Sequence, residues 1–139
     1  MNGNKFVDIM LHTPLRVFMG ETMLITVTGR KTGRHYRTPV GYFQDRGYLW
    51  VLSSRDRTWW RNLQGGATVE LFLNGHEACG FAEPVLEEGA VAERLAAYLK
   101  HMPLAARGLG VHLENGLPNS DDLSSLSRER LFIRIKLLP

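Results

Sequence analysis

Residues 22–53 read TMLITVTGRKTGRHYRTPVGYFQDRGYLWVLS, and this stretch decides the fold. Three runs within it are rich in β-branched or aromatic residues and predict strands. These runs are residues 22–28, 36–43 and 48–53. A turn with glycine at both ends and an Asp-Arg-Gly turn separate them. Connections this short join antiparallel neighbours, so the stretch predicts consecutive hairpins.

The same reading extends to the rest of the chain. Further strands are predicted at residues 68–73, 77–85 and 130–137, and Asn74-Gly75 is a strong signal for a two-residue hairpin loop. Helices are predicted at residues 56–63, with Asp56 as N-cap, and at 87–101. An N-terminal helix is predicted from the spacing of Phe6, Ile9, Met10 and Leu11, and a second short one between Thr13-Pro14 and Gly20. Residues 103–128 carry scattered Gly, Pro, Asn and Ser, and we expect a long irregular loop there.

These elements predict a mainly β fold. Strands and helices do not alternate, which excludes a doubly wound α/β sheet. About six antiparallel strands with two or three helices are typical of a small barrel with appended helices. A length of 139 residues fits one domain over residues 1–139, and 44% hydrophobic with 22% charged residues is ordinary globular usage. We expect a cytoplasmic protein, because Cys79 is the only cysteine and no apolar run approaches about 20 residues.

Charge is distributed unevenly along the chain. Residues 30–61 hold eight Lys and Arg against Asp45 and Asp56, a formal charge of +6, while the rest carries −3. Such a basic region raises the local concentration of anionic ligands, so phosphate esters, nucleic acid and acidic lipid headgroups are candidates. Nucleic acid is the weakest of these, since the aromatic residues are clustered rather than interleaved along a strand as base stacking requires.

Two clusters within this region could carry chemistry. The first is TGRKTGRHYRTP, residues 28–39, in which glycines allow close backbone approach and Arg and Lys supply phosphate ligands. A solvated hairpin tip is the alternative. The second is SSRDRTWWRNL, residues 53–63, which could bind the edge and face of a polar ring. Its alternative is that Trp59 and Trp60 fill the core while Asn62 caps backbone. The spacing of the five histidines does not match a zinc site, so no metal is expected.

Together the clusters resemble the deazaflavin (F420)-dependent nitroreductase and quinone reductase family, whose fold is a split β-barrel related to FMN-binding oxidoreductases. The resemblance rests on Thr28-Gly29-Arg30-Lys31-Thr32-Gly33, Arg37-Thr38-Pro39, Ser54-Arg55 and Trp59-Trp60-Arg61-Asn62-Leu63, in order over about residues 4–86. The chain departs from nitroreductases of the family in its shorter stretch before Trp59 and in lacking tyrosines after the long helix. Prodrug-type nitroreduction therefore does not carry over.

The resemblance implies an oxidoreductase that passes hydride from reduced coenzyme F420 to a quinone, an enone or a nitro compound. It implies that Arg30, Lys31 and Arg37 hold the phosphate and acidic tail, and that the second cluster lines the deazaflavin ring. The expected cofactor-binding residues are Arg30, Lys31, Arg37, Thr38, Ser53, Ser54, Arg55, Trp59 and Asn62. No catalytic residue is assigned, although His101 and His112 are candidate proton donors.

Alternatives stay open for cofactor, partners and the long loop. FMN in the same barrel is the first alternative, and a non-catalytic carrier of a lipid or other apolar ligand is the second. A small-molecule electron acceptor is the expected partner. The N-terminal helix is a candidate for peripheral membrane contact, and the chain a candidate for homodimer formation. We also expect residues 103–128 to close over the cofactor ring and form one wall of the acceptor pocket.

Overall fold

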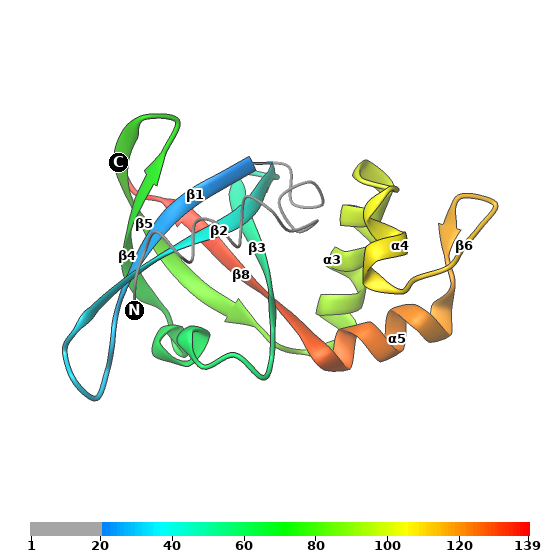
Figure 1. Ribbon diagram of the computed structural model, residues 1–139, viewed down its shortest axis with the longest axis horizontal. Coiled ribbons are helices and arrows are strands. Elements are labelled where there is room, and N and C mark those ends of the chain that lie inside the picture. Colours follow the sequence, from blue (N-terminus) through cyan, green and yellow to red (C-terminus); the bar gives the residue numbers. More distant parts are fainter. Residues whose placement is uncertain (1–20) are drawn as a thin grey trace.

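A computed structural model describes residues 21–139 as a closed antiparallel barrel with helices on one side (Figure 1). The barrel strands are β1 (Glu21–Thr28), β2 (His35–Asp45), β3 (Tyr48–Ser54), β4 (Ala67–Leu73), β5 (His76–Val85) and β8 (Arg130–Leu137). They are ordered β1-β2-β3-β8-β5-β4 around the barrel. The predicted mainly β barrel is therefore confirmed. The predicted N-terminal helices, and the membrane contact assigned to them, lie outside the described residues.

The helical layer packs on one side of the barrel. It consists of α3 (Glu88–His101), α4 (Ala105–Leu109) and α5 (Ser120–Glu129). A small hairpin of β6 (Leu113–Glu114) and β7 (Leu117–Pro118) joins α4 to α5. Within residues 21–139, none of the helices combines the length and apolar character that crossing a membrane requires.

The expectation of an irregular loop at residues 103–128 is wrong. Asn115 and Gly116 both have positive φ, 54° and 78°, and form the turn between β6 and β7. The Asn119 side chain then caps α5 by accepting hydrogen bonds from the backbone N–H groups of Asp121 and Asp122. Both signals are local to the sequence. The Gly, Pro, Asn and Ser residues of this stretch therefore belong to a hairpin and a capped helix rather than to an irregular loop.

The helix predicted at residues 56–63 is also wrong in extent. Only Trp59–Leu63 is helical, as the 3-10 helix η1. Thr58 is the N-cap residue and makes no side-chain cap bond, so Asp56 does not start the helix. Residues before it form a turn in which the Arg57 N–H donates to the Ser54 carbonyl at 3.1 Å.

The paired strands β3 and β8 separate two apolar cores. On β8, Ile133 and Ile135 face the barrel interior, whereas Phe132 faces the helices. On β3, Val51 faces the interior and Trp50 faces the helices. Alternate residues of these strands are thus buried on opposite faces. This explains why few residues of β8 are exposed, although successive side chains point to opposite faces of the sheet.

The barrel is split where β2 leaves β3. The two strands pair only at Phe43–Trp50, Gln44–Leu49 and Asp45–Tyr48. From His35 to Tyr42, β2 pairs with β1, and β3 continues along β8. The start of β2 and the end of β3 therefore diverge. The 3-10 helix η1 contacts β1 and β5 at this end of the barrel and inserts Trp60 and Leu63 into the core.

A carboxylate fixes the chain between α4 and α5. Asp122 Oδ2 accepts hydrogen bonds from the His112 backbone N–H at 2.9 Å and from the His112 ring Nδ1 at 2.8 Å. These bonds, the backbone bond first, hold the pKa of Asp122 below its usual value. Because this pKa is lowered by folding, the added stability is present above the usual Asp pKa of about 3.9 and is lost as the pH falls through the folded pKa.

We therefore expect the His112 amide signal to titrate with an apparent pKa below about 3.9 when followed by NMR through acid pH. In the Asp122→Asn variant this acid transition should vanish. A transition that persists unchanged in the variant would contradict the assignment.

Candidate functional site

The turn between β1 and β2 has a tightly bonded backbone and exposed basic side chains. The Gly29 N–H donates to the Arg34 carbonyl at 2.7 Å, and the Gly33 N–H donates to the Gly29 carbonyl at 2.8 Å. A Cβ on Gly29 would lie 2.7 Å from Cε2 of the exposed Tyr36 side chain, so glycine here lets that ring pack closely on the turn. The side chains of Lys31 and Arg34 are exposed at the tip. We call residues 29–34 the basic turn.

The basic turn is bonded to a segment that lies beside it in space but far from it in the sequence. The Arg30 backbone N–H donates to Asn62 Oδ1 at 3.1 Å, and the Arg30 guanidinium donates to the Gln64 carbonyl. These two hydrogen bonds join Arg30 to residues that lie 32 and 34 positions later in the chain. The two clusters that the sequence identified separately form one surface.

The aromatic element of the site divides its two tryptophans. Trp60 is 6% exposed and belongs to the barrel core, as the sequence alternative proposed. Trp59 is half-buried, and its indole Nε1 donates to Ser53 Oγ at 3.3 Å. The Asn62 side-chain amide donates to the Trp59 carbonyl at 3.1 Å. Ser53, Trp59 and Asn62 are therefore linked at the end of β3.

A buried hydroxyl lies at the start of β2. Thr38 shares the alternation of Val40 and Tyr42, which line the barrel core, so its side chain faces inward. Its Oγ1 is buried and has no hydrogen-bond partner among residues 21–139. Such an orphaned polar atom is costly unless something satisfies it, which makes Thr38 a candidate ligand contact.

Other expected ligands have different surroundings. Arg37 alternates with Thr38 and lies on the outer face, where its guanidinium carbon is 5.9 Å from the centre of the Phe72 ring. Ser54 is half-buried and pairs with Arg130 in the ladder between β3 and β8. Neither residue is hydrogen-bonded to the linked group of Ser53, Trp59 and Asn62 in the described contacts.

Arg55 is a structural connection at the end of β3. Its Nε donates to the Arg130 carbonyl at 2.7 Å, and one terminal nitrogen donates to the carbonyls of Leu86 and Ser127 at 2.6 and 2.9 Å. The guanidinium thus ties β3 to the start of β8, to the approach to α3 and to the last turn of α5. Three of its five N–H donors are occupied by backbone, which leaves its other terminal nitrogen for a ligand.

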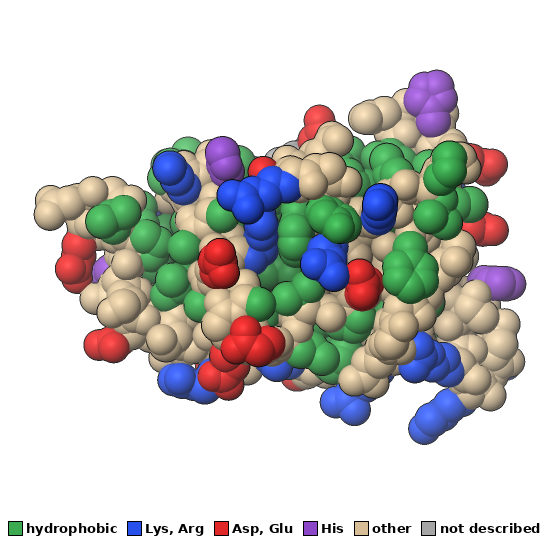
Figure 2. Space-filling view, turned by 180° about the vertical axis from the view of Figure 1, so that it is seen from behind, with side chains coloured by type: hydrophobic (Ala, Val, Ile, Leu, Met, Phe, Trp, Pro, Cys, Tyr) green, Lys and Arg blue, Asp and Glu red, His purple; other side chains and the backbone are tan. Residues whose placement is uncertain are grey.

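The basic region stays electrostatically uncompensated. The ion pairs in residues 21–139 join Arg94 to Asp45, His112 to Asp122 and Arg134 to Glu83. No cation of residues 30–61 takes part in any of these. Figure 2 shows Lys and Arg side chains at the end of the molecule that carries the basic turn, and others over the middle of the same face. This end is therefore suited to an anionic ligand.

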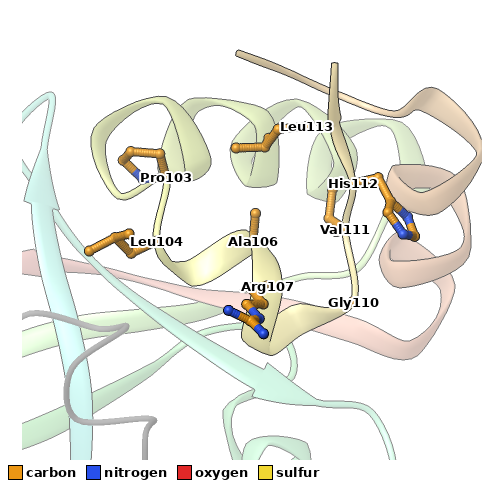
Figure 3. A pocket seen from close by; sticks show the side chains of 8 residues that line it. All are labelled: Pro103, Leu104, Ala106, Arg107, Gly110, Val111, His112 and Leu113. Carbon is orange, nitrogen blue, oxygen red and sulfur yellow. The ribbon is translucent and has the colours of Figure 1, made fainter. Parts of the chain in front are cut away.

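An apolar pocket of about 370 Å³ lies in the helical layer (Figure 3). It is lined by Pro103, Leu104, Ala106, Arg107, Gly110, Val111, His112 and Leu113. Figure 1 places α4 and the basic turn at opposite ends of the molecule. The expectation that residues 103–128 close over the cofactor ring stays a prediction. His112 is bonded to Asp122, and His101 ends α3, about 20 Å along the helix from its start near Arg55.

Sequence reasoning missed two contributors to this surface. Arg34 contributes to the charge of the basic region but is not among the expected site residues, although its place in the same glycine-flanked turn as Lys31 is a signal for it. Gln64 contributes only its main-chain carbonyl to Arg30. No side-chain pattern could have revealed that contact.

Comparisons with known proteins identify a family for the chain. A family model described as F420H(2)-dependent quinone reductase matches residues 11–108. No curated protein shows significant sequence similarity to the chain.

Solved structures share the fold at low identity. A protein of Bacteroides thetaiotaomicron, described as a candidate 5-nitroimidazole antibiotic resistance protein, is similar with a TM-score of 0.58 and 13% identity, covering 99% of this chain and 81% of that one. A conserved hypothetical protein of Mycobacterium tuberculosis reaches 0.59 and 16%, covering 100% and 82%. An F420 reductase reaches 0.50 and 11%, covering 91% and 95%.

The contacts of Arg55 generate a stability prediction. Arg55→Ala should lower the free energy of unfolding by about 2–3 kcal/mol, the scale of hydrogen bonds to a charged group, because three carbonyls lose their donor. Arg55→Lys should recover only part of this, since one ammonium cannot reproduce the planar fork. Urea denaturation measures both variants. Arg57→Ala, an exposed neighbour, is the control, and an equally small loss in Arg55→Ala and Arg57→Ala would refute the structural role.

Proposed function

The chain belongs to the F420H(2)-dependent quinone reductase family, and from that premise we propose that it is an oxidoreductase that uses reduced coenzyme F420. When bound, the reduced deazaflavin supplies a hydride to an electron-poor small molecule such as a quinone, an enone or a nitro compound. The family match over residues 11–108 is the observation that carries this proposal.

The residues at the split end of the barrel fit such a cofactor. Lys31 and Arg34 are exposed cations outside the ion pairs of residues 21–139, which suits a phosphate and an acidic tail. The absence of a Cβ at Gly29 keeps the turn closely packed on Tyr36. The orphaned Thr38 hydroxyl offers a hydrogen bond that the protein itself does not use. These three features support binding of an anionic, partly polar ligand at this end.

We assign different roles to the remaining expected residues. Trp59 and Ser53 would flank the ring, because the indole and the hydroxyl are held together at the end of β3. Arg37 would contribute long-range charge from the outer face. Arg55 would act by holding the end of β3, and with it Ser53 and Ser54, in place. Asn62 and Arg30 would fix the basic turn.

A side-by-side titration tests the cofactor. The purified protein should bind F420 more tightly than FMN when both are followed by fluorescence. Lys31→Ala should weaken F420 binding by about 1.5–3 kcal/mol, the scale for hydrogen bonds to charged groups, and the loss should shrink at high salt. Lys136→Ala is the matched control, because Lys136 is an exposed lysine near the end of β8.

If the protein binds FMN more tightly than F420, and is catalytically active with FMN and a nicotinamide donor, the F420 proposal is wrong and FMN is the cofactor. Binding of neither cofactor would refute the oxidoreductase proposal and favour a carrier of an apolar ligand.

A further inference from the structure

Within the site proposed above, one side chain connects the two regions that would hold opposite ends of the cofactor. Asn62 Oδ1 accepts the hydrogen bond of the Arg30 backbone N–H at 3.1 Å. Its Nδ2 donates to the Trp59 carbonyl at 3.1 Å. The first bond reaches the basic turn, 32 residues earlier in the chain, and the second stays within η1. A side chain that merely capped η1 would make only the second.

The connection continues to the end of β3. The Trp59 indole N–H donates to Ser53 Oγ at 3.3 Å. Three hydrogen bonds in series therefore join the basic turn to β3 through Asn62 and Trp59. The β2–β3 ladder covers only three residue pairs next to the β2–β3 turn. The three hydrogen bonds lie at the opposite end of β3, where β2 and β3 no longer pair. Side chains here take the place of the missing backbone ladder.

The Arg30 guanidinium reinforces the same junction. It donates to the Gln64 carbonyl, so Arg30 is held to the segment after β3 by both its backbone and its side chain. An arginine engaged in this way sets the position of the turn, and Lys31 and Arg34 at the tip are left to meet an anion. The turn and η1 should therefore move together.

We propose that Asn62 is a positioning residue that couples anion binding at the basic turn to the placement of Trp59. This inference rests on the proposed function for its cofactor, but the coupling itself is a property of the protein. The primary amide of Asn62 offers an acceptor to Arg30 and a donor to Trp59 at once, from two different atoms. Binding at one end should then be transmitted to the other as a coupling between two sites.

The test follows the three tryptophan indole N–H signals by NMR during titration with inorganic phosphate. In the wild-type protein the Trp59 signal should shift together with the amide signals of Lys31 and Arg34. The Trp50 indole donates to the Asp45 carbonyl at the other end of β3, so its signal should stay fixed and serve as an internal control. The Trp59→Phe variant assigns the signals.

Removing the amide should break the transmission. In Asn62→Ala, phosphate should still shift the Lys31 and Arg34 amides while the Trp59 response falls at least about fivefold, the lower end of typical coupling factors. Asn62→Asp keeps the acceptor for Arg30 but loses the donor to Trp59, so it should lose the Trp59 response even if Asn62→Ala does not fold. Gln64→Ala is the control, because Gln64 contributes its carbonyl and its side chain is exposed.

The outcomes separate this inference from the proposed function. An unchanged Trp59 response in Asn62→Ala or Asn62→Asp would overturn the coupling role. So would a wild-type Trp59 signal that responds neither to phosphate nor to F420. A Trp59 response that depends on Asn62, in a protein that does not bind F420, would uphold the coupling and refute the cofactor.

Discussion

The ladder between β3 and β8 is the constraint on which the rest of the structure depends. Its six residue pairs, from Leu49–Ile135 to Ser54–Arg130, place apolar side chains on both faces. One face closes the barrel core, and the other supports α3 and α5. Because β8 is the last strand in the chain and lies between β3 and β5, the barrel closes only when residues about 80 apart have paired. Arg55 secures the end of this ladder by bonding to three backbone carbonyls.

The site follows from this arrangement. Because β3 pairs with β8 and most of β2 pairs with β1, β2 and β3 share only three residue pairs and diverge beyond them. The divergence leaves Thr38 and Ser53 at a barrel end that no backbone ladder closes. The 3-10 helix η1 occupies this end, with Trp60 in the core and Trp59 at the edge. The short β2–β3 ladder thus leaves this end of the barrel to side-chain contacts rather than to backbone pairing.

The cations divide into two groups that composition could not distinguish. Arg30, Arg55, Arg94 and Arg134 have their guanidinium groups engaged with carbonyls or carboxylates. Lys31 and Arg34 are exposed at the tip of the basic turn. A cation already bonded to the protein has fewer donors left for a ligand, whereas an exposed one keeps them all. Within the basic region, Arg30 and Arg55 therefore have fewer donors left for an anion than Lys31 and Arg34.

The sequence by itself determined the strands, the hairpin turns and the residues of the two clusters. These features are local: alternation fixes which face a side chain takes, and positive φ at residues such as Gly33 fixes a turn. The turn at Asn115-Gly116 and the Asn119 cap of α5 are local features of the same kind. Only the tertiary structure decided that Asn62 meets Arg30, that Arg55 bonds to Leu86, Ser127 and Arg130, and that residues 103–113 lie away from the basic turn. Those contacts join segments 31 to 75 residues apart, and their partners are mostly backbone carbonyls and N–H groups, which every residue type carries alike.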